Sequence, residues 1–187
     1  MSGESLRMPA GSQTVGPYFR IGLEYLLDRT PSITLETPGM MEIRGRVLDR
    51  DGAPVPDAML EFWSDTTAAR GFDADDEPRN FPVGFRRAIT DADGAYSIVI
   101  ERPSTELHES AHAPHMMVLV FARGLLRHLI SRVYLGDEPD NQSDPVLALI
   151  PEERRSTLIA HPDASRVGVY GWDVLLQGPG ETVFFAW

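Results

Sequence analysis

Apolar and polar residues alternate along residues 41–65, and the pair Asp51-Gly52 interrupts the alternation once. Side chains of a β-strand point alternately to its two faces, so this pattern predicts a strand, a tight turn and a second strand. The same pattern returns along residues 84–102, around Asp93-Gly94. Glycine favours such turns because it adopts the left-handed backbone conformation without strain. The alternation therefore predicts an all-β fold.

Further strands are predicted downstream. Residues 115–124 and 129–135 are rich in Val, Leu and Ile and are separated by a short polar link, which indicates two neighbouring strands. Residues 168–187 are predicted to form a closing hairpin that turns at residues 178–180, where two glycines flank a proline. Several short strands with turn signals between them are typical of a β-sandwich.

Residues 143–160 depart from the strand pattern. Asp144 followed by Pro145 is a typical helix beginning, and Pro151 followed by Glu152 is another. We expect two short helices here. The predicted fold is an antiparallel β-sandwich with a short helical insertion before the last hairpin.

Residues 1–40 are rich in Gly, Pro, Ser and Thr and show little periodicity. They are predicted to form an extended N-terminal arm with one helical turn near residues 21–27. Residues 41–187 then form one sandwich domain, long enough to bury a sizeable core. The apolar residues 183–187 are expected to be buried in this sandwich or against a partner chain, because an exposed strand of this kind would promote association.

Composition excludes several classes of function. The formal net charge of −11 argues against nucleic acid and anionic membranes as partners. The chain has no cysteine, which excludes disulfides, a thiol nucleophile and cysteine-based metal sites. No apolar run is long enough for a membrane helix, and the first residues lack the apolar segment of a secretory signal. We therefore expect a soluble cytoplasmic protein.

Histidines near the strand at residues 115–124 raise the question of a metal. On that strand the side chain that follows His115 on the same face is Met117. A His-x-His pair would indicate a metal site, but a thioether is a soft ligand that suits Cu(I). Tyr96, Tyr134 and Tyr170 fall on predicted strands, where a half-buried tyrosine is ordinary. The histidines and glutamates of residues 106–115 have no recognised zinc-ligand spacing.

Four segments, taken in order and spacing, resemble the intradiol ring-cleaving dioxygenases. They read RGRVLDRDGAPVPDAMLEFW, ITDADGAY, APHMMVLVFARGLLRHLISRVYLGDE and DPVLALIPEERRSTLIA, and the likeness extends from about Ser12 to the last residue. The resemblance implies a β-sandwich fold. It also implies a non-haem Fe(III) held by two tyrosines and two histidines, and cleavage of a catechol ring between its two hydroxyl carbons by dioxygen.

The four ligand positions of that family can be placed on this sequence by motif. The histidine pair corresponds to His115 and Met117. One tyrosine position falls at residues 70–72, where the sequence reads Arg-Gly-Phe, and the other near residues 102–103, where it reads Arg-Pro. One ligand of four is present, and ferric iron prefers hard oxygen ligands such as phenolate. The resemblance therefore implies that this chain holds no iron of its own and that His115 is a remnant or a structural histidine.

Some members of the family pair an iron-bearing beta chain with a related alpha chain that lacks the ligands. The resemblance assigns this sequence to the second kind, with a related iron-bearing beta subunit as its partner. The Fe(III) would be held by that partner, the alpha–beta pairs would assemble further, and the substrates would be protocatechuate and dioxygen.

The alpha chain of such a pair supplies part of the wall of the substrate pocket. Carried over by motif, its residues are Thr14, Gly16, Pro17, Tyr18 and Arg132. The Gly-Pro pair makes a stiff bend of the backbone, and the threonine offers a hydroxyl. The arginine lies in an otherwise apolar strand, where its guanidinium would favour the carboxylate of protocatechuate.

Two alternatives stay open on the sequence alone. Residues 43–100 also resemble the carboxypeptidase-regulatory type of sandwich, a non-catalytic binding module, but this likeness leaves the arm, the helices and the last hairpin unexplained. The second alternative is an autonomous intradiol dioxygenase with unusual iron ligands, which the missing tyrosines disfavour. A neighbouring gene for a related chain with the four intact ligands would separate the alpha-chain hypothesis from both.

Overall fold

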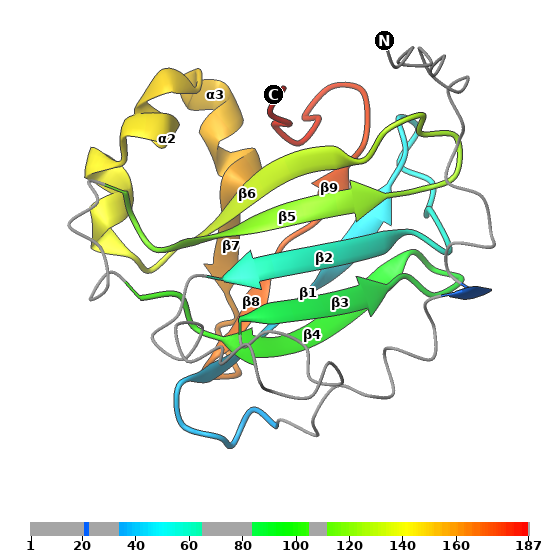
Figure 1. Ribbon diagram of the computed structural model, residues 1–187. Helices are drawn as coiled ribbons and strands as arrows, with labels where there is room; N and C mark the ends of the chain where they lie inside the picture. The colour runs from blue at the N-terminus through cyan, green and yellow to red at the C-terminus, as the bar shows by residue number, and fades with distance from the viewer. Residues whose placement is uncertain (1–20, 23–33, 65–83, 105–111, 187) are drawn as a thin grey trace, which may run out of the picture.

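The computed structural model describes residues 21–22, 34–64, 84–104 and 112–186 (Figure 1). Its strands are β1 (Met40–Leu48), β2 (Met59–Ser64), β3 (Phe85–Ile89), β4 (Ala95–Glu101), β5 (His115–Phe121), β6 (Leu129–Leu135), β7 (Ile159–Pro162), β8 (Val169–Gly171) and β9 (Val174–Leu175). Between β6 and β7 lie the short helices η2 (Pro139–Ser143), α2 (Pro145–Leu149), α3 (Glu152–Arg155) and η3 (Ser156–Leu158).

Within the described residues the nine strands form one continuous sheet, in the order β3-β2-β5-β6-β7-β8-β1-β4, with β9 also paired to β1. The sheet folds back on itself, so that β5, β2 and β3 lie in front of β1, β8 and β9 (Figure 1). Side chains from both layers fill the space between them, including Ile43 of β1, Phe62 of β2 and Val118 of β5. The predicted all-β sandwich is confirmed.

Strand pairing in the described residues is antiparallel at five pairs and parallel at three, namely β1–β8, β1–β9 and β6–β7. Parallel pairing needs a long crossover connection between the strands. The helical segment between β6 and β7 supplies one, and the sequence pattern did not reveal which strands it would join.

The helical insertion forms where it was predicted. Asp144 is the N-cap residue of α2, and its carboxylate accepts hydrogen bonds from the backbone N–H groups of Val146 and Leu147. Pro145 occupies the beginning of the helix, where a missing N–H costs nothing. Pro151 caps α3, whose first turn is acidic and whose last turn is basic. This charge order suits the helix dipole.

The closing hairpin is present only in part. Its turn forms as predicted, with positive φ at Gly178 and Gly180. Thr182 N–H donates to Leu175 O at 2.9 Å, but the residues after it form no regular strand. Instead, Phe185 N–H donates to Ile130 O of β6 at 2.7 Å, so the end of the chain crosses to the other layer. The predicted continuous second strand is therefore wrong for residues 181–186.

Gly45 of β1 lies beside Trp172, which connects β8 to β9 in the same layer of the sandwich. A Cβ at this position would come 1.8 Å from Trp172 O, so the backbone after β8 can approach β1 only because residue 45 has no side chain. The same carbonyl accepts a hydrogen bond of 2.6 Å from the hydroxyl of Tyr96. Tyr96, Tyr134 and Tyr170 are all buried, which is deeper than the half-burial predicted for them.

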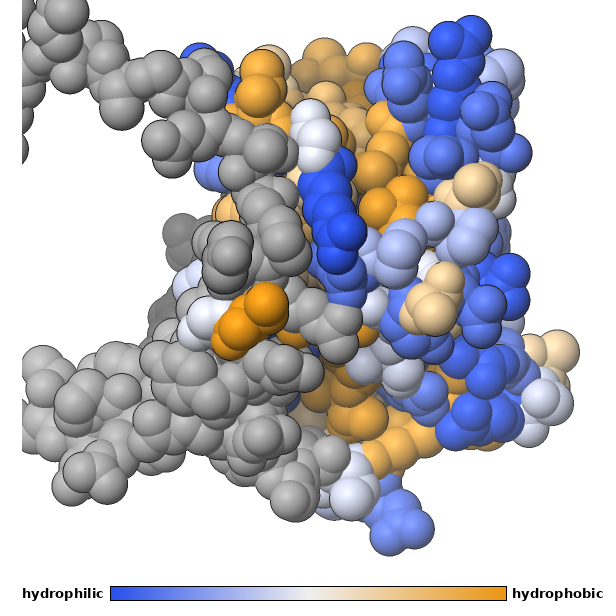
Figure 2. All heavy atoms as spheres, turned by 90° about the vertical axis from the view of Figure 1, so that its right-hand side faces the viewer, coloured by the Kyte–Doolittle hydropathy of each residue, from blue (hydrophilic) through white to orange (hydrophobic). Residues whose placement is uncertain are grey.

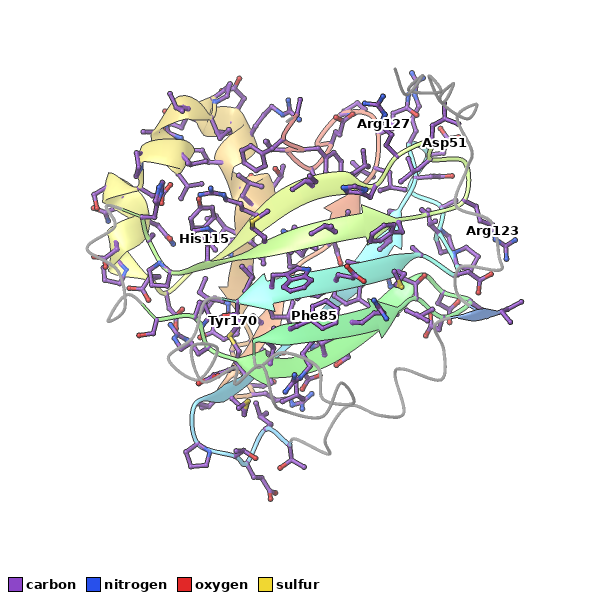
Figure 3. All side chains as sticks on the ribbon, in the orientation of Figure 1. Asp51, Phe85, His115, Arg123, Arg127 and Tyr170 are labelled. Carbon is purple, nitrogen blue, oxygen red and sulfur yellow. The ribbon has the colours of Figure 1, made fainter. Side chains whose placement is uncertain are left out.

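One end of the sandwich carries the turns near Asp51 and the link between Arg123 and Arg127 (Figure 3). Figure 2 faces this end and shows hydrophilic residues over much of it, beside a band of hydrophobic ones. His115 begins β5 on the opposite side, where α2 and α3 lie (Figure 3). None of the helices that the structure describes has the length and apolar character required to cross a bilayer.

The end of the chain packs on its own sandwich. Val183 is buried, and Phe184 and Phe185 are half-buried against the two core clusters. This settles the expectation for these three residues in favour of burial within the domain. Of the N-terminal arm, the structure describes residues 21–22, which are helical, and residues 34–40, so the rest of the predicted arm lies outside the described residues.

Candidate functional site

The candidate site is the outer face of β5 and β6. Along β5, Met116, Val118 and Val120 point into the core, so His115 and Met117 share the opposite, half-buried face. The strand register sets His115 opposite Tyr134 and Met117 opposite Arg132. The sequence-predicted residues His115, Met117 and Arg132 are thus brought together, and Tyr134 joins them.

Arg132 is held by two aromatic side chains. Its Nη1 donates to the Tyr134 hydroxyl at 3.4 Å. Its guanidinium carbon lies over the Phe185 ring, 5.9 Å from the ring centroid, within the range of a cation–π contact. Arg132 forms no ion pair in the described part of the chain. Its positive charge is therefore not neutralised by a neighbouring carboxylate among these residues.

Asp144 is the buried carboxylate that accepts a hydrogen bond from Tyr134. It is 1% exposed, accepts from Ala113 N–H at 2.9 Å, and caps α2 through the N–H groups of Val146 and Leu147. Burial acts to raise the pKa of Asp144, but the hydrogen bonds from Leu147, Ala113, Tyr134 and Val146 outweigh it and hold the pKa below its ordinary value. The buried group is therefore a carboxylate and accepts hydrogen bonds only.

Tyr134 lies between the carboxylate and the guanidinium. Its side chain is fully buried, and its hydroxyl donates to Asp144 Oδ1 at 3.2 Å. Burial, with the Asp144 charge, raises the pKa of Tyr134 to about 12, although Arg132 acts in the opposite direction. The hydroxyl thus keeps its proton and donates a hydrogen bond to Asp144, while its lone pairs accept from Arg132.

His115 is a neutral imidazole in this setting. Its Nδ1 lies 2.8 Å from Ala113 O, which can only accept, so Nδ1 carries the proton. Burial lowers the pKa of His115, the Arg132 charge also lowers it, and the Ala113 carbonyl opposes the shift. The ring packs against the Tyr134 ring with centroids 5.2 Å apart.

The ferric iron that the resemblance implies does not fit these residues. Met117 offers a thioether where the family has its second histidine, and the cation of Arg132 stands opposite it. At the described tyrosine position, Arg102 donates to the Tyr170 hydroxyl and pairs with Asp137 at 3.2 Å. No group of three or more His, Cys, Asp or Glu side chains that could hold a metal occurs among the described residues.

Several predicted site residues lie outside the described residues, namely Thr14, Gly16, Pro17, Tyr18 and Phe72. Sequence reasoning missed the roles of Asp144 and Phe185 beside Arg132. The helix-cap signal at Asp144-Pro145 was visible in the sequence, but its contact with Tyr134 depends on how the helical segment returns to β6. No local signal marked Phe185.

An open groove of about 770 Å³ lies elsewhere, along β1 and β4, and its lining includes Arg44, Arg46, Asp91 and Asp173. Its carboxylates accept hydrogen bonds from nearby backbone groups. Asp173 accepts from Arg46 N–H, and Asp91 accepts from the N–H groups of its own turn. None of the sequence-predicted site residues that the structure describes lines it. The groove is therefore separate from the candidate site.

The fold and this site can now be set beside known proteins. The sequence profile of the family described as Dioxygenase matches residues 15–178. The chain belongs to this dioxygenase family.

Three curated relatives are chains of protocatechuate 3,4-dioxygenases. The protocatechuate 3,4-dioxygenase alpha chain of Burkholderia cepacia is 44% identical, covering 93% of this chain and 95% of the relative. The alpha chain of Pseudomonas putida is 34% identical, covering 93% of this chain and 94% of the relative. The beta chain from Burkholderia cepacia is 30% identical, covering 75% of this chain and 65% of the relative.

Solved structures agree on the fold. A dioxygenase domain from Streptomyces sp. SirexAA-E matches with a TM-score of 0.58 at 24% identity, covering 79% of this chain and 86% of that chain. An intradiol ring-cleavage dioxygenase from Tetranychus urticae matches with a TM-score of 0.56 at 14% identity, covering 79% of this chain and 87% of that chain. These likenesses confirm the fold.

Proposed function

We propose that this chain is the alpha chain of a heteromeric protocatechuate 3,4-dioxygenase. The observation that carries the proposal is the match to two alpha chains over nearly their full length. The assembled enzyme cleaves the protocatechuate ring between the two hydroxyl carbons with dioxygen, giving 3-carboxy-cis,cis-muconate. This reaction belongs to aromatic degradation through the beta-ketoadipate pathway. A cytoplasmic location forms part of the proposal.

The non-haem Fe(III) belongs, in this proposal, to a related beta chain. Two observations support it: of the described ligand positions, one keeps its histidine (His115) while the others carry Met117 and Arg102, and the sequence is also 30% identical to a beta chain. The role of this chain is then to shape the pocket around the substrate. The proposed assembly is an oligomer of alpha–beta pairs.

The proposed pocket residues of this chain are Arg132 and the arm residues Thr14, Gly16, Pro17 and Tyr18. Arg132 supports the proposal by its geometry, since its guanidinium forms no ion pair among the described residues and is steadied by Tyr134 and Phe185. A guanidinium pairs with a carboxylate through two parallel hydrogen bonds. Protocatechuate has a carboxylate beside its two hydroxyls, and plain catechol lacks it.

The test is co-expression with a candidate beta chain that has the four intact ligands. The expected result is a stable complex that consumes oxygen with protocatechuate and releases 3-carboxy-cis,cis-muconate, while this chain alone is inactive. The same beta chain expressed alone serves as the control for what this chain adds. A complex that associates but turns over no catechol would contradict the proposal and favour a non-catalytic binding module.

A further inference from the structure

We propose that Tyr134, anchored by Asp144, and Phe185 are positioning residues that aim the Arg132 guanidinium at the substrate carboxylate and so set the preference for a carboxylated catechol. This inference rests on the proposed function. It adds residues of β6, of the helical segment and of the C-terminal segment to the determinants of specificity. Without such contacts the Arg132 side chain would be free to rotate about its bonds.

An arginine side chain without contacts samples many rotamers. Holding its rotatable bonds in one geometry loses rotamer entropy, and where the protein has not already restricted the side chain, that loss weakens substrate binding. Arg132 and Tyr134 are two residues apart on β6, so their side chains leave the strand on the same face. The 3.4 Å contact from Nη1 to the Tyr134 hydroxyl restricts the guanidinium before any ligand arrives.

The contact can do this only because Tyr134 is itself fixed. Its side chain is fully buried and its hydroxyl donates to Asp144 Oδ1 at 3.2 Å. Asp144 is fixed in turn by the backbone N–H groups of Ala113, Val146 and Leu147. The hydrogen bonds run in one direction, from a guanidinium that only donates to a carboxylate that only accepts, which strengthens each of them.

Phe185 supplies the second restraint. Its ring lies against the Arg132 guanidinium at 5.9 Å, and its backbone N–H is bonded to Ile130 O at 2.7 Å, so the ring cannot drift from β6. Among the described residues Tyr134 is the one hydrogen-bond partner of the Arg132 side chain. Its other N–H groups form no hydrogen bond with another described residue, and a guanidinium presents such groups in the planar arrangement that a carboxylate accepts.

The structure offers a matched control. Arg102 donates to the Tyr170 hydroxyl, and that hydroxyl donates to Asp137 at 2.9 Å, which repeats the Arg–Tyr–Asp order between β8 and the residues that follow β4 and β6. Tyr170→Phe removes the same hydroxyl from the same kind of chain. It leaves Arg132 and its contacts in place.

The experiment uses the alpha–beta complex carrying Arg132→Ala, Tyr134→Phe, Phe185→Leu, Tyr170→Phe or the double change Arg132→Ala/Tyr134→Phe. KM and kcat are measured for protocatechuate and catechol. Equilibrium dissociation constants are measured for 4-hydroxybenzoate and phenol, which have a single hydroxyl. The readout is the ratio of the constants for the carboxylated and the plain member of each pair, so a general loss of folding or iron cancels.

We expect Tyr134→Phe and Phe185→Leu each to raise the protocatechuate-to-catechol KM ratio about fivefold, the size of one hydrogen bond near 1 kcal/mol, with kcat changing far less. The 4-hydroxybenzoate-to-phenol ratio should rise in parallel. In the double change, removing the Tyr134 hydroxyl should add nothing to the effect of Arg132→Ala, because Tyr134 acts through Arg132. Tyr170→Phe should leave both ratios unchanged.

Three outcomes would overturn the inference. If Arg132→Ala raises the ratios and neither Tyr134→Phe nor Phe185→Leu does, the positioning role fails while the proposed function stands. If Tyr170→Phe raises the ratios as much as Tyr134→Phe does, the rise does not come from the positioning of Arg132. If Arg132→Ala leaves the ratios unchanged in an active complex, the role of Arg132 fails together with this inference. Should Tyr134→Phe prevent assembly, Phe185→Leu decides the result.

Discussion

Met117 and Arg132 face each other across the β5–β6 pair, where the resemblance to iron-binding members would place a second histidine beside the metal. A soft thioether and a permanent positive charge both disfavour a ferric ion at this position. The face retains one imidazole, at His115, which is neutral and bonded to its own backbone. At the residue scale, this face carries a permanent cation where a ferric site would need oxygen and imidazole ligands.

Replacing Arg132 by alanine in the alpha–beta complex should lower kcat/KM for protocatechuate by about 10- to 150-fold, the equivalent of about 1.5–3 kcal/mol for a charge-assisted hydrogen bond. The loss should appear mainly in KM. Steady-state oxygen uptake measures it, with catechol as the comparison substrate. Unchanged kinetics with protocatechuate in the assembled variant would contradict the pocket role of Arg132.

Tyr134 should make the chain sensitive to alkali. Its pKa is raised from 10.0 to about 12 in the fold, so the folded state keeps a proton that the unfolded state releases. The contribution is complete below about pH 10 and is lost as the pH rises toward 12, amounting to about 2–3 kcal/mol. Tyr134→Phe should therefore lose less stability than the wild type between pH 9 and pH 11.5.

Urea unfolding followed by tryptophan fluorescence at a series of pH values measures this difference. Tyr96 and Tyr170 also have a raised pKa and titrate in both proteins, so their contribution cancels in the comparison. Parallel pH profiles for the two proteins would show that Tyr134 ionises as readily in the folded state as in the unfolded state.

At the scale of elements, α2 is five residues long and depends on its cap. Isolated helices of this length are unstable, so the Asp144 carboxylate and the packing of Leu147 hold it in place. Because Asp144 also binds Ala113 and Tyr134, the cap connects the helical insertion to β6 and to the residues just before β5.

Asp144→Ala should destabilise the protein by about 3–5 kcal/mol, because it removes the cap and leaves the buried donors of Ala113 and Tyr134 without partners. Asp144→Asn keeps one acceptor oxygen and should cost clearly less. Urea midpoints of the purified chain, or of the complex where the chain is obtained only with its partner, compare the two variants. Equal losses would mean that the hydrogen bonds to the carboxylate contribute little.

Gly45→Ala tests the close approach of the β8–β9 connection to β1. The added Cβ would lie 1.8 Å from Trp172 O, a backbone atom that cannot move without displacing the core, so we expect a loss of about 3 kcal/mol. Gly171→Ala is the matched control, since its Cβ would meet its nearest neighbour, His161 O, at 4.0 Å. Thermal unfolding gives the melting temperature of each variant, and similar values would contradict a close approach of Trp172 to β1 that only glycine allows.

Local signals predicted the elements well where the cause is local. The Asp-Gly pairs at residues 51–52 and 93–94 mark turns because glycine accepts positive φ there, and Asp144-Pro145 marks a helix because both residues suit its first turn. Partners distant in the sequence were not predictable. The parallel pairing of β8 and β9 with β1, and the crossing of Phe185 to Ile130, depend on how the layers pack.

At the scale of the whole molecule, the sandwich is a rigid support whose outer β5–β6 face is completed by the helical segment and the end of the chain. The resemblance supplied His115, Met117 and Arg132 as candidates, and the register of β5 and β6 explains why they lie together. Under the proposed function, this chain is a subunit with a related partner. The proposed pocket is built by two sandwiches, of which the partner supplies the metal and this chain a guanidinium.

The iron content of the purified chain and of the alpha–beta complex tests most directly whether the partner chain alone holds the metal. Metal analysis of both samples, after expression in iron-supplemented medium, should find no iron in this chain alone and iron stoichiometric with the beta chain in the complex. Stoichiometric iron in the isolated chain, together with turnover of protocatechuate, would contradict the account and place the metal on residues of this chain.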